Sequence, residues 1–333
     1  MEWLADLLQG SFLGQPTWAW LSFLVIVALL LVLDLGVLHR RQGEIPVGES
    51  LWLSAGYIAV ALAFGGWVWL SLGAEAGIAY YTGFLVEKSL SLDNVFVISL
   101  IFTYFAVPRI HQHRVLFWGI LGVIVLRGIM IGLGAALVSQ FSWILYVFGV
   151  FLIATGIKML LMADSMPRIE DNPVLRLLRR HLNLTDALHG ERFFVKAPCP
   201  RDPRRKVWWA TPLFLALVLV ETADLIFAVD SVPAIFAITT DPFVVYTSNI
   251  FAILGLRALY FALAAMIHRF HYLKYALSAV LIFIGGKIFW NLLVGKMDPV
   301  ISLSVTGALL AGGIVVSLLR TRGAQSPNPN PAA

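Results

Sequence analysis

The amino-acid sequence predicts an all-α fold, a polytopic membrane helix bundle of about nine transmembrane helices with two inverted three-helix repeats. Composition is the first reason, because 59% of the 333 residues are apolar and only 13% are charged. Soluble domains average roughly half apolar and a quarter charged residues. Nine long apolar runs and an order of motifs that recurs once along the chain are the other two reasons.

Each apolar run is close to or longer than the roughly 20 residues that a helix needs to cross a bilayer. The first run is too long for the apolar part of a signal peptide, and no basic segment or small-residue cleavage site flanks it, so we expect a retained first span. The predicted spans are 18–38, 50–72, 78–106, 114–138, 141–163, 207–238, 243–267, 273–294 and 299–319.

These spans predict a single membrane domain over residues 1–333. The only sizeable polar segment, 164–206, is rich in proline around a helix-like stretch at 174–182, and it is too short to build a core of its own. We expect a solvated cytoplasmic linker there. The C-terminal segment 323–333 is also rich in proline and is expected to be disordered.

Segments 78–163 and 207–294 are predicted to be two copies of one three-helix unit. The sequence Phe-Ser-Trp-Ile-Leu-Tyr at 141–146 matches Phe-His-Tyr-Leu-Lys-Tyr at 270–275. Because each copy has an odd number of spans, the second is predicted to be inverted relative to the first, as in many secondary transporters. The corresponding polar and glycine residues are Glu87 with Asp224, Asp93 with Asp230, Asn94 with Ser231, Arg127 with Arg257, Gly156 with Gly285, and Lys158 with Lys287.

Basic residues are distributed unequally between the two sets of loops. The set that includes the linker and the C-terminus contains 17 Lys and Arg residues, whereas the opposite set contains only Lys296. The positive-inside rule therefore predicts a multi-pass protein of the cell (inner) membrane, with the N-terminus outside and the C-terminus in the cytoplasm. The net charge of +5 then reflects topology, so the bilayer is the expected partner and no nucleic acid is needed. The oligomeric state stays open.

Two predicted spans contain acidic motifs, Glu-Lys-Ser-Leu-Ser-Leu-Asp-Asn at 87–94 and a run from 221 to 231 with three acids. An ionisable side chain at the centre of a bilayer costs about 3 kcal/mol on insertion scales, so it normally faces a cavity, pairs with a charge or binds an ion. Two arginines cannot offset five clustered carboxylates. The sequence therefore predicts a cation site formed by these motifs.

The predicted membrane core offers this cation only oxygen ligands, because all seven His residues and the single Cys lie on or beside the cytoplasmic loops. Oxygen ligands suit manganese, calcium and magnesium rather than copper or zinc. We predict no cofactor other than the transported divalent cation, and the ligand chemistry leaves manganese, calcium and magnesium open. The predicted metal ligands are Glu87, Asp93, Asn94, Glu221, Asp224, Asp230 and Ser231, with Asp34, Ser91, Arg127 and Arg257 in supporting roles.

Helix geometry divides these residues between faces. Glu87, Ser91 and Asn94 share a face, as do Asp224 and Ser231, whereas Asp93 and Asp230 point away from those faces. Pro233 predicts a kink or an unwound segment near Asp230. Arg127 and Arg257 are the expected partners of the acids, and for these arginines and Asp34 we favour a structural pairing role.

The motifs resemble those of the TerC family of integral membrane proteins, and most closely its Alx-like members. The resemblance rests on segments 34–37, 87–94, 221–234 and 247–257 and extends from the first predicted span to the ninth. It implies a polytopic transporter of the LysE-like superfamily, linked to manganese export, to metal homeostasis under alkaline stress and, by name, to tellurite resistance. The family's acidic positions fall here on Glu87, Asp93, Glu221, Asp224 and Asp230, with Asp34 on the first span.

We therefore expect a secondary transporter that exports a hard divalent cation through an acidic site at the repeat interface, with proton coupling as one option. The resemblance makes manganese the first candidate for this cation. We do not expect an enzyme, because the chain lacks the motifs of intramembrane aspartyl, zinc and serine proteases. Two alternatives stay open. One is a scaffold for membrane-protein assembly or stress response, and the other is an exporter of small organic cations.

Overall fold

The computed structural model describes residues 10–39, 46–161, 169–199, 202–263 and 273–323. Two short hairpins accompany the helices: β1 (Ser11–Phe12) with β2 (Gln15–Pro16), and β3 (Phe194–Cys199) with β4 (Asp202–Ala210). The helices are α2 (Thr17–His39), α3 (Val47–Leu72), α4 (Ala74–Tyr104), α5 (Arg109–Gln140), α6 (Ile144–Leu161), the short 3-10 helix η1 (Ile169–Asp171), α7 (Pro173–His181), α8 (Pro212–Ile238), α9 (Pro242–Ile253), α10 (Leu256–Leu263), α11 (Leu273–Leu293) and α12 (Pro299–Gly323).

The prediction of an all-α polytopic membrane bundle is confirmed. Among the described residues, seven helical segments are long and apolar enough to cross a membrane, formed by α3, α5, α6, α8, the α9–α10 pair, α11 and α12. The other two predicted spans coincide with α2, of which only Thr17–Leu33 has described side chains, and with α4, which carries the charged 87–94 motif. The total of nine therefore stays a prediction.

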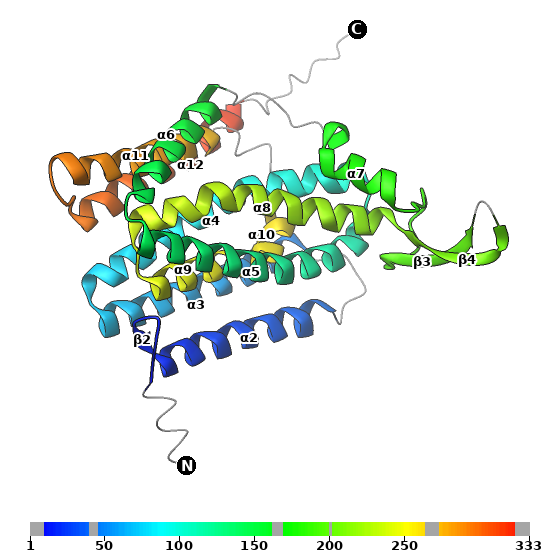
Figure 1. The fold of residues 1–333 in the computed structure, drawn as a ribbon, viewed down its shortest axis with the longest axis horizontal. Coiled ribbons are helices and arrows are strands. Elements are labelled where there is room, and N and C mark those ends of the chain that lie inside the picture. The colour runs from blue at the N-terminus through cyan, green and yellow to red at the C-terminus, as the bar shows by residue number, and fades with distance from the viewer. Residues whose placement is uncertain (1–9, 40–45, 162–168, 200–201, 264–272, 324–333) are drawn as a thin grey trace, which may run out of the picture.

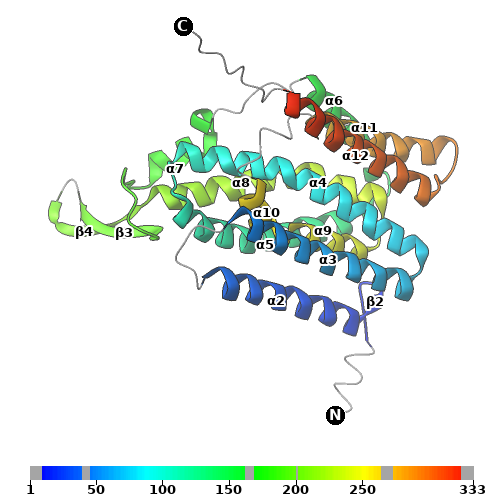
Figure 2. The same ribbon diagram turned by 180° about the vertical axis from the view of Figure 1, so that it is seen from behind.

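The helices form a bundle in which α4, α5, α8 and the α9–α10 pair lie centrally (Figure 1). Both views place α6, α11 and α12 together on one side of this centre and α2 on the opposite side (Figure 2). Aromatic residues attach α2 to the bundle, because Phe23 contacts Phe64 of α3 and Phe251 of α9. The central helices therefore have protein on both sides and can hold polar side chains away from lipid.

The linker holds more structure than the sequence predicted. The expected helix at 174–182 is present as α7, and Asn172 caps its first turn by accepting a hydrogen bond from Val174 N at 2.9 Å. The antiparallel β3–β4 hairpin was not predicted, and it projects beyond one end of the bundle (Figure 1). Its second strand includes 207–210, so α8 begins at Pro212 instead of 207. Proline favours the first helical position, so Pro212 indicates this start. The prediction missed it because the apolar residues before it extended the predicted span.

The seventh predicted span is broken. Helix α9 ends at Ile253 and α10 starts at Leu256, and between them Gly255 has a φ of +79°. A Cβ at Gly255 would lie 2.7 Å from the ring of Tyr57, so both the backbone angle and the packing require glycine. In contrast, α8 continues through Pro233 without interruption. The expectation of an unwound segment near Asp230 was therefore wrong, whereas the kink expected there stays a prediction.

Helices α6 and α11 approach each other closely through glycine. A Cβ added at Gly156 would lie 2.8 Å from the carbonyl oxygen of Ser278, and one added at Gly285 would lie 2.7 Å from that of Gly149. In the predicted repeat, Gly156 corresponds to Gly285 and Gly149 to Ser278, so the two contacts are reciprocal. This reciprocity favours a two-fold relation between the halves, although the inverted repeat stays a prediction. Of the disordered tail predicted at 323–333, Gly323 is the last residue of α12, and 324–333 lie outside the described residues.

We predict that Gly285→Ala destabilises the protein whereas Gly286→Ala does not. At Gly285 the new methyl group would overlap the backbone of α6, which cannot move aside like a side chain, and overpacking of this kind costs about 1–3 kcal/mol. At Gly286 the methyl group would meet nothing within 4 Å, and alanine is the better helix former. Thermal unfolding of the purified variants in detergent tests this. Equal midpoints would contradict the close approach of α6 and α11.

Candidate functional site

Arg127 of α5 lies at the centre of a buried polar cluster. Its guanidinium donates through Nε to Asp224 Oδ2 at 3.4 Å and through Nη2 to Asp224 Oδ1 at 3.2 Å. Its Nη1 forms an ion pair with Glu87 of α4. Arg127 is only 1% exposed, Glu87 3% and Asp224 5%, so the three charges interact in a low dielectric. The cluster therefore joins one acid from each predicted repeat.

Neutral side chains complete the coordination of the guanidinium. Nη1 also donates to Ser231 Oγ of α8 and to Asn249 Oδ1 of α9, each at 3.0 Å. Asn94 of α4 lies alongside and donates through Nδ2 to Asp224 Oδ1 at 3.1 Å. All these side chains are buried, and they come from α4, α8 and α9. The groups around Arg127 are thus carboxylate, amide and hydroxyl oxygens, the ligands that a hard cation prefers.

Two oxygen atoms in this region are buried without a hydrogen-bond partner among the described residues. One is Oδ1 of Asn94, beside Asp224, and the other is Oε2 of Glu221, one helical turn earlier on α8. The carboxylate of Glu221 packs against Gly122 of α5, where any side chain would collide with it. Unpaired buried acceptors cost about 1–3 kcal/mol each, so each of these atoms needs a partner that the described side chains do not supply.

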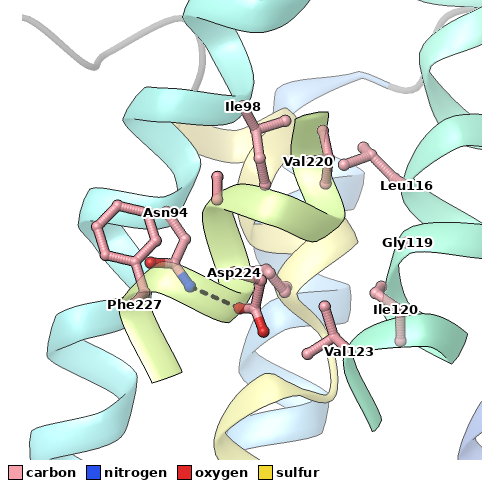
Figure 3. A pocket seen from close by; sticks show the side chains of 11 residues that line it. Asn94, Ile98, Leu116, Gly119, Ile120, Val123, Val220, Asp224 and Phe227 are labelled. Carbon is pink, nitrogen blue, oxygen red and sulfur yellow. Dashed lines mark hydrogen bonds between the residues drawn. The ribbon is translucent and has the colours of Figure 1, made fainter. Parts of the chain in front are cut away.

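A small cavity lies beside the cluster. Asn94 and Asp224 line it and point toward one another, and apolar side chains such as Ile98, Leu116 and Val123 form its walls (Figure 3). Its volume of about 20 Å³ is enough for one water molecule or a single small ion. The lining residues come from the halves of α4, α5 and α8 that lie toward the β3–β4 hairpin, together with Leu256 of α10. The cavity therefore adjoins Asp224 on that side of the bundle.

The remaining predicted site residues are not all in the cluster. Asp230 faces α6 and accepts a hydrogen bond from Thr155 Oγ1 at 3.1 Å, with Lys158 also near enough to interact with it. This agrees with the expectation that Asp230 points away from Asp224. Ser91 donates to the carbonyl oxygen of Glu87 in its own helix at 2.8 Å instead of joining the cluster.

Three further residues complete the comparison with the predicted site. Arg257 is buried at the start of α10, directly after the break. The side chains of Asp34 and Asp93 lie outside the described part of the chain. Among the side chains that the structure does describe, no group of three or more His, Cys, Asp and Glu residues comes together as a metal centre would. Ligation of a metal by the predicted residues stays a prediction.

Sequence reasoning missed the roles of two residues. Asn249 belongs to a buried polar string at 247–249, which was the available signal, but its contact with Arg127 depends on how α9 packs on α5. Lys88 donates through Nζ to the carbonyl oxygen of Ala252 at 3.0 Å, where the end of α9 has lost its next helical turn. A cation at a helix C-terminus is favourable, so Lys88 stabilises the break beside the cluster.

Comparisons with known proteins agree with the motifs and the bundle. A family model described as "Integral membrane protein TerC family" matches residues 72–325. The chain belongs to the TerC family. An uncharacterized membrane protein of Myxococcus xanthus is 48% identical over 309 residues, covering 93% of this chain and 94% of the relative. No solved structure matches the chain.

Two other similar TerC-family relatives carry the name Alx and are described as candidate membrane-bound redox modulators. The relative from Photorhabdus laumondii is 45% identical over 321 residues, covering 92% of this chain and 95% of its own. The relative from Escherichia coli (strain K12) is 48% identical over 284 residues, covering 83% and 86%. The resemblance to Alx-like proteins that the motifs indicated is confirmed.

We predict that Lys88→Met lowers the stability of this TerC-family protein by about 1–3 kcal/mol, because the Ala252 carbonyl loses its ammonium donor while the length of the side chain is kept. The matched control is Lys296→Met, which removes an ion pair with Glu75 in which both side chains are 71% exposed. Exposed pairs of this kind contribute little, so the control should unfold like the wild type. Equal unfolding midpoints for the two variants would show that Lys88 does not stabilise the break.

Proposed function

We propose that this protein is a secondary transporter that exports a hard divalent cation, with manganese as the first candidate. The observation that carries the proposal is that Glu87 and Asp224, one acid from each predicted repeat, contact the same guanidinium group. Oxygen atoms of buried side chains surround this position. Transporters built from inverted repeats place their substrates at the repeat interface. The expected ligands are Glu87, Asp224, Asn94, Ser231 and Asn249.

Charge and access support a cation as the cargo. Glu87, Asp224 and Arg127 together carry a net charge of minus one, so this position in the bilayer attracts cations and repels anions. The cavity beside Asp224 has room for one ion without its full hydration shell. Its apolar walls would hinder free leakage of hydrated ions, as hydrophobic constrictions do in channels.

A second candidate, export of a small organic cation, has one observation in its favour. The shell of oxygen atoms holds the guanidinium group of Arg127, so its geometry fits a planar organic cation. Competition experiments separate the two candidates, because excess arginine or lysine would inhibit transport of an organic cation. Manganese transport that neither amino acid inhibits would favour the metal as the cargo.

The relatives' description as candidate redox modulators does not require thiol chemistry in this chain. Cys199 is its single cysteine, which excludes an internal disulfide. A redox effect of this chain would need an intermolecular disulfide, a bound redox group or an indirect route, and a change in the concentration of a cellular metal is one such route.

We predict that Glu87→Gln and Asp224→Asn each lower manganese transport at least about tenfold, the effect of losing 1.4 kcal/mol of binding or more. Each substitution keeps the size of the side chain and removes its charge. From the sequence motifs we expect the same loss for Asp93→Asn and for Asp230→Asn, although Asp230 lies apart from the cluster, against Thr155. The measurement is manganese flux in vesicles containing the purified variants, and Glu75→Gln, at an exposed position, is the matched control. A normal rate for Glu87→Gln or Asp224→Asn would remove that residue from the site.

We further propose that transport is coupled to protons. Carboxylates clustered in a low dielectric compete for protons with a metal, which binds only the deprotonated form. Apparent manganese affinity should therefore fall as pH falls. Vesicles loaded with a pH-sensitive dye should report proton movement opposite to that of the metal. A manganese flux without counter-movement of protons, and insensitive to an uncoupler at fixed membrane potential, would point to a uniporter or another coupling ion.

The direction of transport depends on orientation, and we propose that the linker faces the cytoplasm of the cell membrane. In a Cys199→Ser background, Arg180→Cys should react with a membrane-impermeant thiol reagent only after the membrane is opened, whereas Lys296→Cys should react in intact cells. The reason is the excess of basic residues on the side that contains the linker. Labelling of position 180 in intact cells would reverse the orientation and turn export into import.

A further inference from the structure

Glu221 is the acid of the α8 motif that the cluster around Arg127 leaves without a role. Its Oε2 is buried and has no hydrogen-bond partner among the described residues, although Asp224 one turn away accepts three hydrogen bonds. The carboxylate is held against Gly122 of α5. The side chain as a whole is partly exposed, but its buried oxygen is costly while it lacks a partner, so another state of the protein is expected to supply one.

The spacing of the acids on α8 indicates which partner is within reach. Glu221 and Asp224 lie three residues apart, so they share a face of this helix with about 5–6 Å between their Cβ atoms. Arg127 already contacts Asp224, at 3.2 and 3.4 Å. The guanidinium that now contacts Asp224 therefore has a second acid, Glu221, on the next turn of the same neighbouring helix, α8.

Charge balance provides the driving force for a move between these acids. If a divalent cation joined Glu87 and Asp224 while Arg127 stayed, the group would carry a net charge of plus one, with two cations side by side in a low dielectric. If the guanidinium moved to Glu221, the cation and its two carboxylates would be neutral. The new pair of Arg127 and Glu221 would be neutral as well.

We propose that the guanidinium group of Arg127 fills the cation site when cargo is absent and moves to Glu221 when cargo binds. This proposal rests on the proposed function. Arg127 then competes with the cargo for Glu87 and Asp224. Glu221 acts as a positioning residue for the guanidinium and not as a ligand of the cargo. The exchange keeps every carboxylate of the cluster paired both with and without cargo.

The test is a double-mutant cycle on manganese binding by the purified full-length protein in lipid nanodiscs, read from the loss of the electron paramagnetic resonance signal of free Mn²⁺. Glu221→Gln should weaken binding at least about tenfold, since the guanidinium loses its second partner, and Glu221→Asp should restore most of the affinity. Arg127→Gln should tighten binding by a similar factor. In that background Glu221→Gln should have no further effect, and Glu75→Gln should leave the affinity of the wild-type protein unchanged.

Equal weakening by Glu221→Gln in the wild-type and Arg127→Gln backgrounds would make Glu221 a direct ligand and overturn the proposal. Should Arg127→Gln fail to give a monodisperse protein, Arg127→Lys replaces it. Its ammonium lacks the two-pronged contact with Asp224, so binding should tighten and the effect of Glu221→Gln should shrink; an undiminished effect overturns the proposal. Loss of binding in Glu87→Gln and Asp224→Asn keeps the proposed function intact in either case, whereas binding that survives both removes the cation site itself.

Discussion

The buried guanidinium of Arg127 is the constraint on which the centre of this bundle depends. An arginine that is 1% exposed at membrane depth needs anionic partners, and here Glu87 and Asp224 supply them from two different helices. Removing one partner of a buried ion pair costs about 3–5 kcal/mol, because the other charge stays buried. The cluster therefore fixes how α4, α5, α8 and α9 meet, and it places polar atoms where a lipid-facing helix could not hold them.

Most of the fold could be predicted from the sequence, because the bilayer imposes a length and an apolar composition on every helix that crosses it. The predicted start of the ninth span, at 299, agrees with that of α12 to the residue. The β3–β4 hairpin was not predicted, because its strands lie among prolines and basic residues, which are typical of a solvated linker. The break at Gly255 was not predicted either, since a single glycine in an apolar run does not reveal its φ angle.

The candidate site was predictable in composition and less so in arrangement. Carboxylates at membrane depth are conspicuous in a sequence, and helical spacing correctly separated Asp230 from Asp224. The acidic motif at 221–231 placed Glu221 among the predicted ligands, yet its carboxylate lies against Gly122 of α5. The contacts of Asn249 and Lys88 depend on the packing of α9 against its neighbours, which helical periodicity within one segment does not contain.

The glycine contacts between α6 and α11 couple these two helices to each other. Where their backbones approach at Gly149 and Gly285, no side chain lies between them that could repack, so neither helix can slide at this point without moving the other. The same pair borders α8, and the hydrogen bond between Thr155 of α6 and Asp230 of α8 crosses that border. Asp230, the acid that lies apart from the central cluster, is therefore the one that bonds this pair of helices to α8.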